Sequence, residues 1–214
     1  MNMHIHKRFA PPQEVVHLLA QTYTFDPYAK NDPTRVLLSC ILSARTKDEI
    51  TYPTADRLFS FYPTTLSLCQ AHLTDLENIL KPVGFYRQKA KYVRDAACYI
   101  EKWGVPKTTK ELTQVPGIGP KCAAIVRAFG WGIPDIAVDT HVQRISKRLG
   151  WTEEKDDHLQ TQAKLKTLLP IHEWVYVNHL LVSLGRHVCR PQRPLCKQCV
   201  LNQKSNICPY PSNP

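Results

Sequence analysis

Long hydrophobic runs are absent from this sequence of 214 residues. No stretch approaches the roughly 20 apolar residues that span a bilayer, and residues 1–8 lack the apolar core of a signal peptide. No segment alternates polar and apolar residues as a strand does, and there is no Gly/Ser-rich linker or repeat. These absences exclude an integral membrane protein and predict an all-α protein of the cytoplasm, or of the nucleus in a eukaryote.

Acidic residues are scarce relative to basic ones. Lys and Arg total 28 against 18 Asp and Glu, which gives a net charge of +10 and a pI near 9.3. Such a balance favours a polyanionic partner, either nucleic acid or an anionic surface. With 43% hydrophobic residues the chain is globular, and it is long enough for one domain or two small ones.

Apolar residues recur with a helical period along most of the chain. Asp32, Asp48 and Asp139 are placed as N-caps, and Thr74 and Thr108 each stand three residues before a glutamate, as in a capping box. The predicted helices cover residues 13–22, 33–42, 48–59, 63–71, 88–103, 122–130, 140–149, 155–169 and 174–188, with short helices after Thr74 and Thr108.

The predicted helix at residues 88–103 is amphipathic. Its charged side carries Lys89, Lys91 and Arg94. A charged face of this kind is usually solvated, so no site is assigned to it.

The eight cysteines form two unlike groups. One group is scattered among the apolar residues of helical segments and consists of Cys40, Cys69, Cys98 and Cys122. We interpret these four as small buried hydrophobic side chains. The other is bunched near the C-terminal end and consists of Cys189, Cys196, Cys199 and Cys208. In a cytosolic chain such clustering favours a metal over disulfides. Zinc and an iron–sulfur cluster both fit the thiolates, although the absence of paired knuckles leans to iron.

The segment at residues 115–121, Val-Pro-Gly-Ile-Gly-Pro-Lys, forms a tight turn between two helical patterns. Gly117 and Gly119 allow backbone N–H groups to point outward at a helix N-terminus, where they can bind a phosphate without reading sequence. Lys121 follows in the first turn of the second helix. It is either a phosphate-contacting lysine or an amine that attacks carbon, since the helix N-terminus disfavours a positive charge there.

Asp139 bears on that choice. A carboxylate near an amine can relay a proton and stabilise positive charge that develops on a sugar. Asp139 can serve as an N-cap at the same time, and His141 is either a structural histidine or a helper beside Asp139. The presence of both Lys121 and Asp139 favours the catalytic interpretation.

The turn, the Asp139 segment and the C-terminal cysteines resemble the endonuclease III family of DNA glycosylases, in order and at similar spacing over nearly the whole chain. The resemblance implies a two-lobed helix–hairpin–helix fold with a C-terminal iron–sulfur cluster loop. It implies that Lys121 attacks the sugar C1′ and that Asp139 assists. It also implies a 4Fe-4S cluster held by Cys189, Cys196, Cys199 and Cys208.

The implied lobes are a central domain at residues 26–135 and a second domain made of residues 1–25 and 136–214. Lys121 and Asp139 are then expected to face each other across a DNA-binding cleft. Arg45 stands where the family has a glutamine that fills the gap left by the flipped base, and Phe85 matches the wedge beside the estranged base. The other predicted DNA contacts are Gly117, Gly119, His141, Arg186 and Arg193.

The implied function is that of a bifunctional DNA glycosylase and AP lyase of base excision repair. Damaged bases, expected to be oxidised pyrimidines, would be removed and the abasic site cleaved by β-elimination through a lysine Schiff base. The expected partner is double-stranded DNA with a damaged base, the expected location the nucleoid or nucleus, and the expected state a monomer.

Two departures from the family pattern keep alternatives open. Eight residues separate Cys199 from Cys208, where the family has five. Position 45 is an arginine, whose charged planar guanidinium prefers guanine or phosphate as a partner. A thymine or uracil mismatch glycosylase is one alternative. A non-catalytic DNA-binding module is another, against which Lys121 and Asp139 count. An adenine-mismatch enzyme typically lacks the lysine and carries an extra domain.

Overall fold

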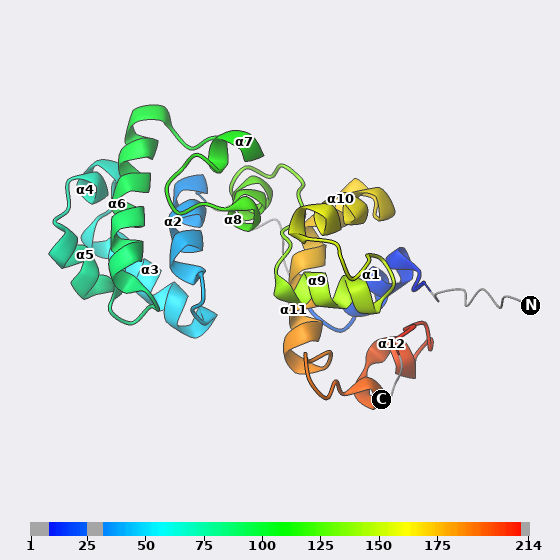
Figure 1. Cartoon of the computed structure of the whole chain (residues 1–214). Helices are drawn as coiled ribbons and strands as arrows, with labels where there is room; N and C mark the ends of the chain where they lie inside the picture. Colours follow the sequence, from blue (N-terminus) through cyan, green and yellow to red (C-terminus); the bar gives the residue numbers. More distant parts are fainter. Residues whose placement is uncertain (1–8, 25–31, 211–214) are drawn as a thin grey trace, which may run out of the picture. The chain divides into compact units, whose positions relative to one another are not determined.

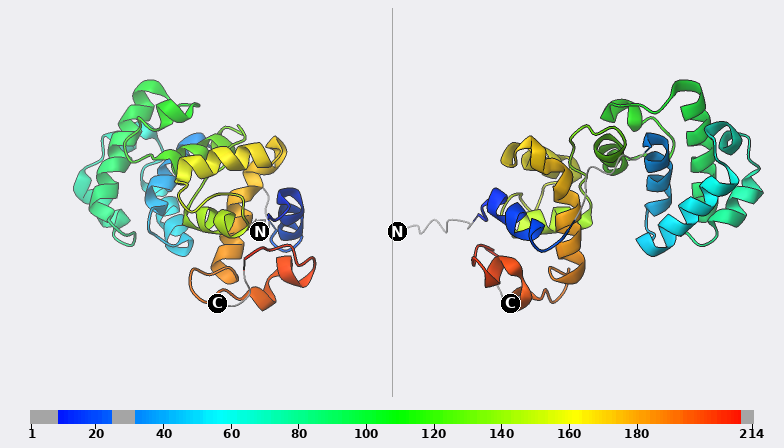
Figure 2. Two further views of the ribbon diagram at one scale, coloured as in Figure 1. Left: turned by 45° about the vertical axis from the view of Figure 1, so that its right-hand side comes forward. Right: turned by 180° about the vertical axis from the view of Figure 1, so that it is seen from behind.

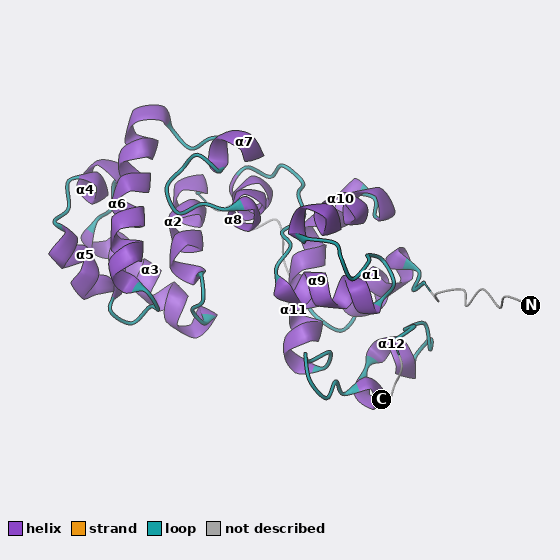
Figure 3. Cartoon of the chain, viewed as in Figure 1, coloured by secondary structure: helices purple, strands orange, loops and turns teal. Residues whose placement is uncertain are grey.

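The computed structural model describes residues 9–24 and 32–210, and within these ranges every regular element is helical (Figures 1 and 3). None of the described helices is long and apolar enough to cross a membrane. The signal-peptide assessment of residues 1–8 and the predicted domain boundary at Asp26 lie outside the described residues.

The chain divides into two compact units. The central unit contains the described residues of Tyr28–Ile133, and the terminal unit those of Met1–Pro27 and Pro134–Pro214. Each unit has its own hydrophobic core.

The central unit is organised around its longest helix, α6 (Tyr86–Trp103). Figure 1 shows α4, α5 and α2 alongside it, and these three pairs are in contact. Its core includes Leu37, Leu80 and Val93, all buried. The other elements are α2 (Pro33–Ser43), α3 (Asp48–Phe61), α4 (Thr65–Cys69), α5 (Leu73–Leu80), α7 (Thr109–Leu112), α8 (Pro120–Ile125) and the π-helical turn η1 (Val126–Gly130).

The terminal unit joins the N-terminal helix to the C-terminal ones. Helix α1 (Pro12–Ala20) packs against α11 (Trp174–His187) and α12 (Val200–Gln203), as Figure 2 shows from two sides. Val15, Ile145 and Leu181 are among the buried residues of this core. The remaining elements are α9 (Thr140–Arg148), α10 (His158–Leu168) and the 3₁₀ turns η2 (Ile171–Glu173) and η3 (Cys196–Gln198).

Three of the five predicted helix starts are confirmed. The side chains of Asp32, Thr108 and Asp139 accept hydrogen bonds from backbone N–H groups in the first turns of α2, α7 and α9. The other two are wrong. Asp48 is the first residue of α3 itself, with Lys47 as the N-cap, and Thr74 is the second residue of α5, which begins at Leu73 with His72 as its N-cap.

The prediction of one helix at residues 122–130 needs correction. The α-helix ends at Ile125 and the chain continues as a π-helical turn to Gly130. A Cβ at Gly130 would lie 2.9 Å from the Cα of Pro33, so η1 packs directly on the start of α2. The close contact explains why the last residue of the turn is glycine.

The interpretation of Cys69 and Cys98 as unpaired buried residues is wrong. They form a disulfide that joins α4 to α6, with their Cα atoms 4.7 Å apart. This separation lies within the range that a disulfide requires, and it arises because α4 packs along α6. Cys40 and Cys122 are free, as predicted.

Candidate functional site

The glycine turn before α8 adopts the predicted hairpin. Ile118 N donates to Val115 O at 3.1 Å, and Gly117 has a φ of 82°, in the left-handed region that glycine tolerates. A Cβ at Gly117 would lie 2.9 Å from the Cβ of Tyr92 on α6. The turn therefore requires glycine both for its backbone conformation and for its close contact with α6.

Lys121 occupies the first turn of α8, directly after the N-cap Gly119 and the helix-starting Pro120. It is exposed. The first N–H groups of any helix lack intrahelical acceptors, so an anion such as a DNA phosphate can bind beside this lysine.

Asp139 is held at the start of α9. Its Oδ1 accepts hydrogen bonds from the N–H groups of His141 and Val142, both at 2.9 Å. These bonds fix the orientation of a half-buried carboxylate. Lys121 belongs to the central unit and Asp139 to the terminal unit.

Hydrogen bonds continue from Asp139 toward the cysteines. The Nη2 of Arg144 lies 3.1 Å from Nδ1 of His141 and donates to the carbonyl oxygen of Cys189 at 3.0 Å. A Cβ at Gly185 would lie 2.5 Å from the same His141 nitrogen, so α9 and α11 are in close contact. Sequence reasoning missed Arg144, because nothing in the local pattern distinguishes it from a solvated arginine.

The four C-terminal cysteines lie in the terminal unit, between the end of α11 and the residues after α12. Burial raises the pKa of Cys199 to about 11, and the neighbouring charges of Cys208 and Cys189 act in the same direction. Burial likewise raises the pKa of Cys208. The thiols therefore lie close enough to influence one another electrostatically, although no three His, Cys, Asp or Glu side chains in the described part of the chain are arranged to hold a metal ion.

Arg148 provides a cation at this loop. Its Nη1 donates to Sγ of Cys189 at 3.1 Å and to the carbonyl of Arg190 at 2.7 Å, and its guanidinium lies 4.5 Å from the ring centroid of Tyr210. The arginine therefore places a positive charge beside the sulfur of Cys189. It is a second residue that sequence reasoning missed.

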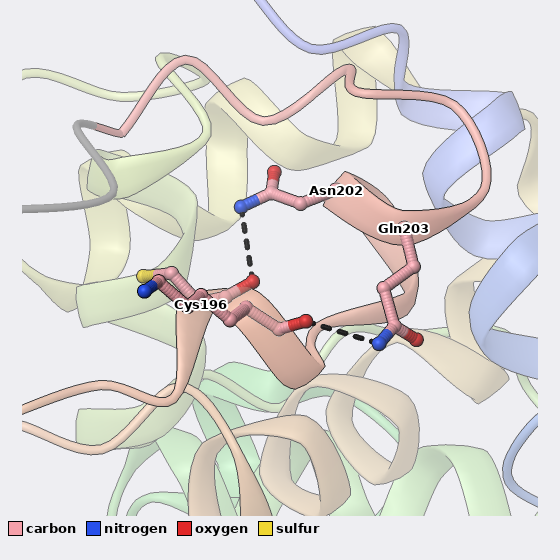
Figure 4. A pocket seen from close by; sticks show the side chains of 4 residues that line it. Cys196, Asn202 and Gln203 are labelled. Atoms are coloured by element: carbon pink, nitrogen blue, oxygen red, sulfur yellow. Dashed lines mark hydrogen bonds between the residues drawn. The ribbon is translucent and has the colours of Figure 1, made fainter.

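The loop around η3 is held by amide side chains, as Figure 4 shows. Asn202 Nδ2 donates to the carbonyl of Cys196 at 3.2 Å, and Gln203 Nε2 donates to the carbonyl of Lys197 at 3.0 Å. These four residues line a hollow of about 300 Å³. Arg186 and Arg193, two of the predicted DNA contacts, are exposed in the same unit.

Arg45 and Phe85 lie side by side in the central unit. Both have positive φ values, 52° and 57°, and both are exposed. The Arg45 guanidinium lies 5.4 Å from the centroid of the Phe85 ring, within the range of a cation–π contact. The structure thus brings together the two residues that the sequence assigns to the DNA gap.

The prediction that Lys89 lies on a solvated face is wrong. Lys89 is only 4% exposed, and its ammonium donates to the carbonyl oxygens of Leu42 and Ala44, both at 2.7 Å. The spacing Lys89, Val93, Ile100 follows the buried side of α6, so the helical period contained the signal. The charge of the side chain hid it.

Stability should depend on pH through Lys89. Burial lowers its pKa from 10.5 to about 8. At pH values between about 8 and 10.5, Lys89 is protonated more in the unfolded chain than in the folded protein. This difference makes the folded state more stable as pH rises. Relative to Lys89→Met, the wild-type free energy of unfolding should gain about 2 kcal/mol between roughly pH 7.5 and 9.5, as urea titrations would measure. A constant difference between the two proteins would contradict the lowered pKa, and all other titrating groups cancel in the comparison.

Comparison with known families places the chain among DNA repair proteins. Residues 38–170 match the sequence profile of the family described as HhH-GPD superfamily base excision DNA repair protein. Endonuclease III of Thermotoga maritima is 44% identical over 177 residues, which cover 81% of this chain and 83% of that protein. Endonuclease III-like protein 1 of Bos taurus is 38% identical over 201 residues, covering 91% of this chain and 65% of the bovine protein.

Solved structures of similar fold include a trapped endonuclease III–DNA covalent intermediate with an estranged adenine. It has a TM-score of 0.82 at 30% identity, covering 92% of this chain and 93% of that one. A thermostable thymine-DNA glycosylase has a TM-score of 0.79 at 22% identity, covering 93% and 94% of the two chains. The second likeness concerns the fold alone.

Proposed function

Since this chain belongs to the HhH-GPD superfamily of base excision DNA repair proteins, we propose that Lys121 is the nucleophile of its DNA glycosylase and AP lyase reaction. The combined activity is that of endonuclease III, which the chain matches over most of its length. The observation that carries the proposal is an exposed lysine in the first turn of α8, directly after a phosphate-binding type of hairpin. A relative of similar fold forms a covalent intermediate with DNA.

In the proposed reaction the amine of Lys121 bonds to C1′ as the glycosidic bond breaks and the base leaves with a proton. Opening of the sugar ring yields a Schiff base between Lys121 and C1′. This cation acidifies the C2′ proton, whose removal expels the 3′ phosphate by β-elimination. Water then releases the enzyme.

Asp139 is assigned two tasks in this scheme. Its carboxylate accepts a proton from the attacking amine and stabilises the positive charge that develops on the sugar. The two hydrogen bonds to the start of α9 preset its orientation, so little ordering is required when substrate binds. The central unit carries Lys121 and the terminal unit carries Asp139, and each unit is inferred to bind DNA.

The DNA is held mainly by its backbone. Gly117 and Gly119 of the hairpin are assigned to one phosphate, and His141, Arg186 and Arg193 to phosphates on the terminal unit. Arg45 and Phe85 enter the gap that the extruded nucleotide leaves, which offsets the unstacking cost of a few kcal/mol. The expected partner is therefore duplex DNA with a damaged base. The expected cellular location is that of the chromosome, which is the cytoplasm in a bacterium and the nucleus in a eukaryote.

The proposed substrates are oxidised pyrimidines, and Arg45 favours a mismatch glycosylase as the second candidate, since its donors suit a guanine left opposite an excised thymine or uracil. Duplexes with thymine glycol, 8-oxoguanine, uracil opposite guanine, or a T·G mismatch separate the two. Strand nicking at thymine glycol is the expected result. Nicking confined to uracil and T·G duplexes would establish the mismatch enzyme, and nicking of none of them the non-catalytic binding module.

We propose that Cys189, Cys196, Cys199 and Cys208 hold a 4Fe-4S cluster. Four thiols in one loop region suit soft iron, and Arg148 beside Cys189 offsets the charge of the ligands. When bound, the cluster would supply cross-links that fix the loop after α11. Because Cys199 and Cys208 favour their protonated forms, binding must release protons, which makes loading pH-dependent.

The cluster proposal has a direct chemical test. The purified protein should contain about four iron and four acid-labile sulfide per chain. Cys199→Ser should lose both, together with the visible absorption of the cluster, and should melt at a lower temperature. Cys40→Ala, a buried cysteine of the central unit, is the control and should retain iron. Full iron content in Cys199→Ser, or zinc in place of iron, would refute the assignment.

A further inference from the structure

We propose that Lys89 is a positioning residue, which joins the Arg45 loop and the Phe85 loop into one rigid unit and thereby sets the preference for the base opposite the lesion. The inference rests on the proposed function, in which Arg45 and Phe85 occupy the gap in the DNA. It concerns how that gap is read rather than how the bond is broken.

The first step is the anchoring of the Arg45 loop. The Lys89 ammonium donates three hydrogen bonds, to the carbonyls of Leu42 and Ala44 at 2.7 Å and to Oγ1 of Thr46 at 2.9 Å. These acceptors flank Arg45 on both sides. All three ammonium protons are thus directed to the segment that carries the arginine, in a site where few water molecules can replace them.

The second step connects this segment to the Phe85 loop. Thr46 Oγ1 also accepts a hydrogen bond from the N–H of Gly84 at 3.2 Å. A Cβ at Gly84 would lie 3.3 Å from the carbonyl oxygen of Arg45, so the two loops touch through their backbones. Thr46 is therefore the joint between the two loops, because its Oγ1 accepts hydrogen bonds both from Lys89 and from the Phe85 loop.

The third step concerns backbone strain. Arg45 and Phe85 both lie in the left-handed region, which is unfavourable for residues with a Cβ. Such conformations persist only where the surroundings hold them. Lys89 lies one turn after Phe85 on α6, and its backbone N–H donates to the Phe85 carbonyl at 3.1 Å, so a single residue constrains both strained positions.

The consequence for recognition follows from the chemistry of the guanidinium. Arginine offers only donors, and guanine presents two adjacent acceptors, O6 and N7, where adenine presents one acceptor beside a donor. A guanidinium held against Phe85 directs its N–H donors in one orientation, whereas a mobile guanidinium can adapt to either base. Anchoring by Lys89 therefore favours guanine as the estranged base.

The experiment measures binding of the full-length protein to duplexes that carry a tetrahydrofuran abasic analogue opposite guanine or adenine, with undamaged duplex as reference. Wild type should prefer the guanine duplex by about tenfold. Lys89→Met should reduce this ratio to near one and leave binding to undamaged duplex unchanged. Lys91→Met, an exposed lysine of the same helix, is the matched control and should keep the wild-type ratio.

A double-mutant comparison separates positioning from general destabilisation. In the Arg45→Ala background, Lys89→Met should change the guanine-to-adenine ratio no further. A preference that survives in Lys89→Met, or an equal loss on all three duplexes, overturns the proposal. If Lys89→Met does not fold, Thr46→Val removes the joint and must abolish the preference in the same way. Nicking of an abasic duplex by wild type, assayed in parallel, tests the proposed function independently of this result.

Discussion

The Lys121→Gln protein is expected to bind an abasic duplex as tightly as wild type and to form no covalent adduct with it in the presence of borohydride. Glutamine keeps a side chain of similar length, but its amide nitrogen is not a nucleophile. Loss of the nucleophile should lower strand cleavage by on the order of 10⁴-fold or more. Trapping on a denaturing gel and single-turnover nicking measure the two effects.

The matched control is Lys110→Gln, which removes an exposed lysine of the neighbouring helix α7. It should trap and nick as wild type does, because a lysine that contacts only solvent or phosphate has no part in the bond changes. Equal trapping of Lys121→Gln and wild type would show that another amine attacks C1′. The hairpin would then be an anchor alone.

Replacement of Asp139 should separate its two tasks. Asn is as good an N-cap as Asp, so Asp139→Asn should retain both hydrogen bonds to α9 and nearly all of the stability. It loses the charge and the proton acceptor. Base excision should therefore fall by roughly 10²–10⁴-fold in single-turnover assays, while the melting temperature stays close to that of wild type.

Asp139→Ala is the companion variant. It should show the same catalytic loss and an additional stability loss of about 1 kcal/mol, because the first turn of α9 loses its cap. An Asn variant as active as wild type would mean that Asp139 is a structural cap only. An Asn variant as unstable as the Ala variant would mean that the carboxylate stabilises α9 by its charge.

Local signals were sufficient for most of the fold. Asp32, Thr108 and Asp139 lie where short polar side chains accept from the first N–H groups of a helix, a preference that depends on neighbouring residues alone. The hairpin at Gly117 is similarly local. The N-caps lie at Lys47 and His72, one and two residues before the predicted Asp48 and Thr74, and the π-helical turn after Ile125 lies against Pro33, a neighbour that is distant in sequence.

The candidate site was less predictable, because its missing parts depend on tertiary contacts. The Cys69–Cys98 disulfide requires α4 to lie against α6, and the spacing of the two cysteines in the sequence does not predict this helix packing. Arg144 bridges two helices through carbonyls far along the chain. Lys89 differs from these residues, because its position in the apolar period of α6 is that of a buried residue and the incorrect prediction of exposure rested on its charge. Helical phase was the better guide there.

Gly185 gives a consequence for inherited variation. One base change turns a glycine codon into an alanine codon, and the added methyl group would meet His141 and the Arg144 guanidinium within 3.0 Å. These two residues connect two parts of the terminal unit. Arg144 contacts the His141 ring and donates to the carbonyl of Cys189, and the backbone N–H of His141 donates to the Asp139 carboxylate. A damaging allele is thus expected at a position outside the residues assigned to DNA and to the cluster, and a survey restricted to those residues would classify the change as harmless.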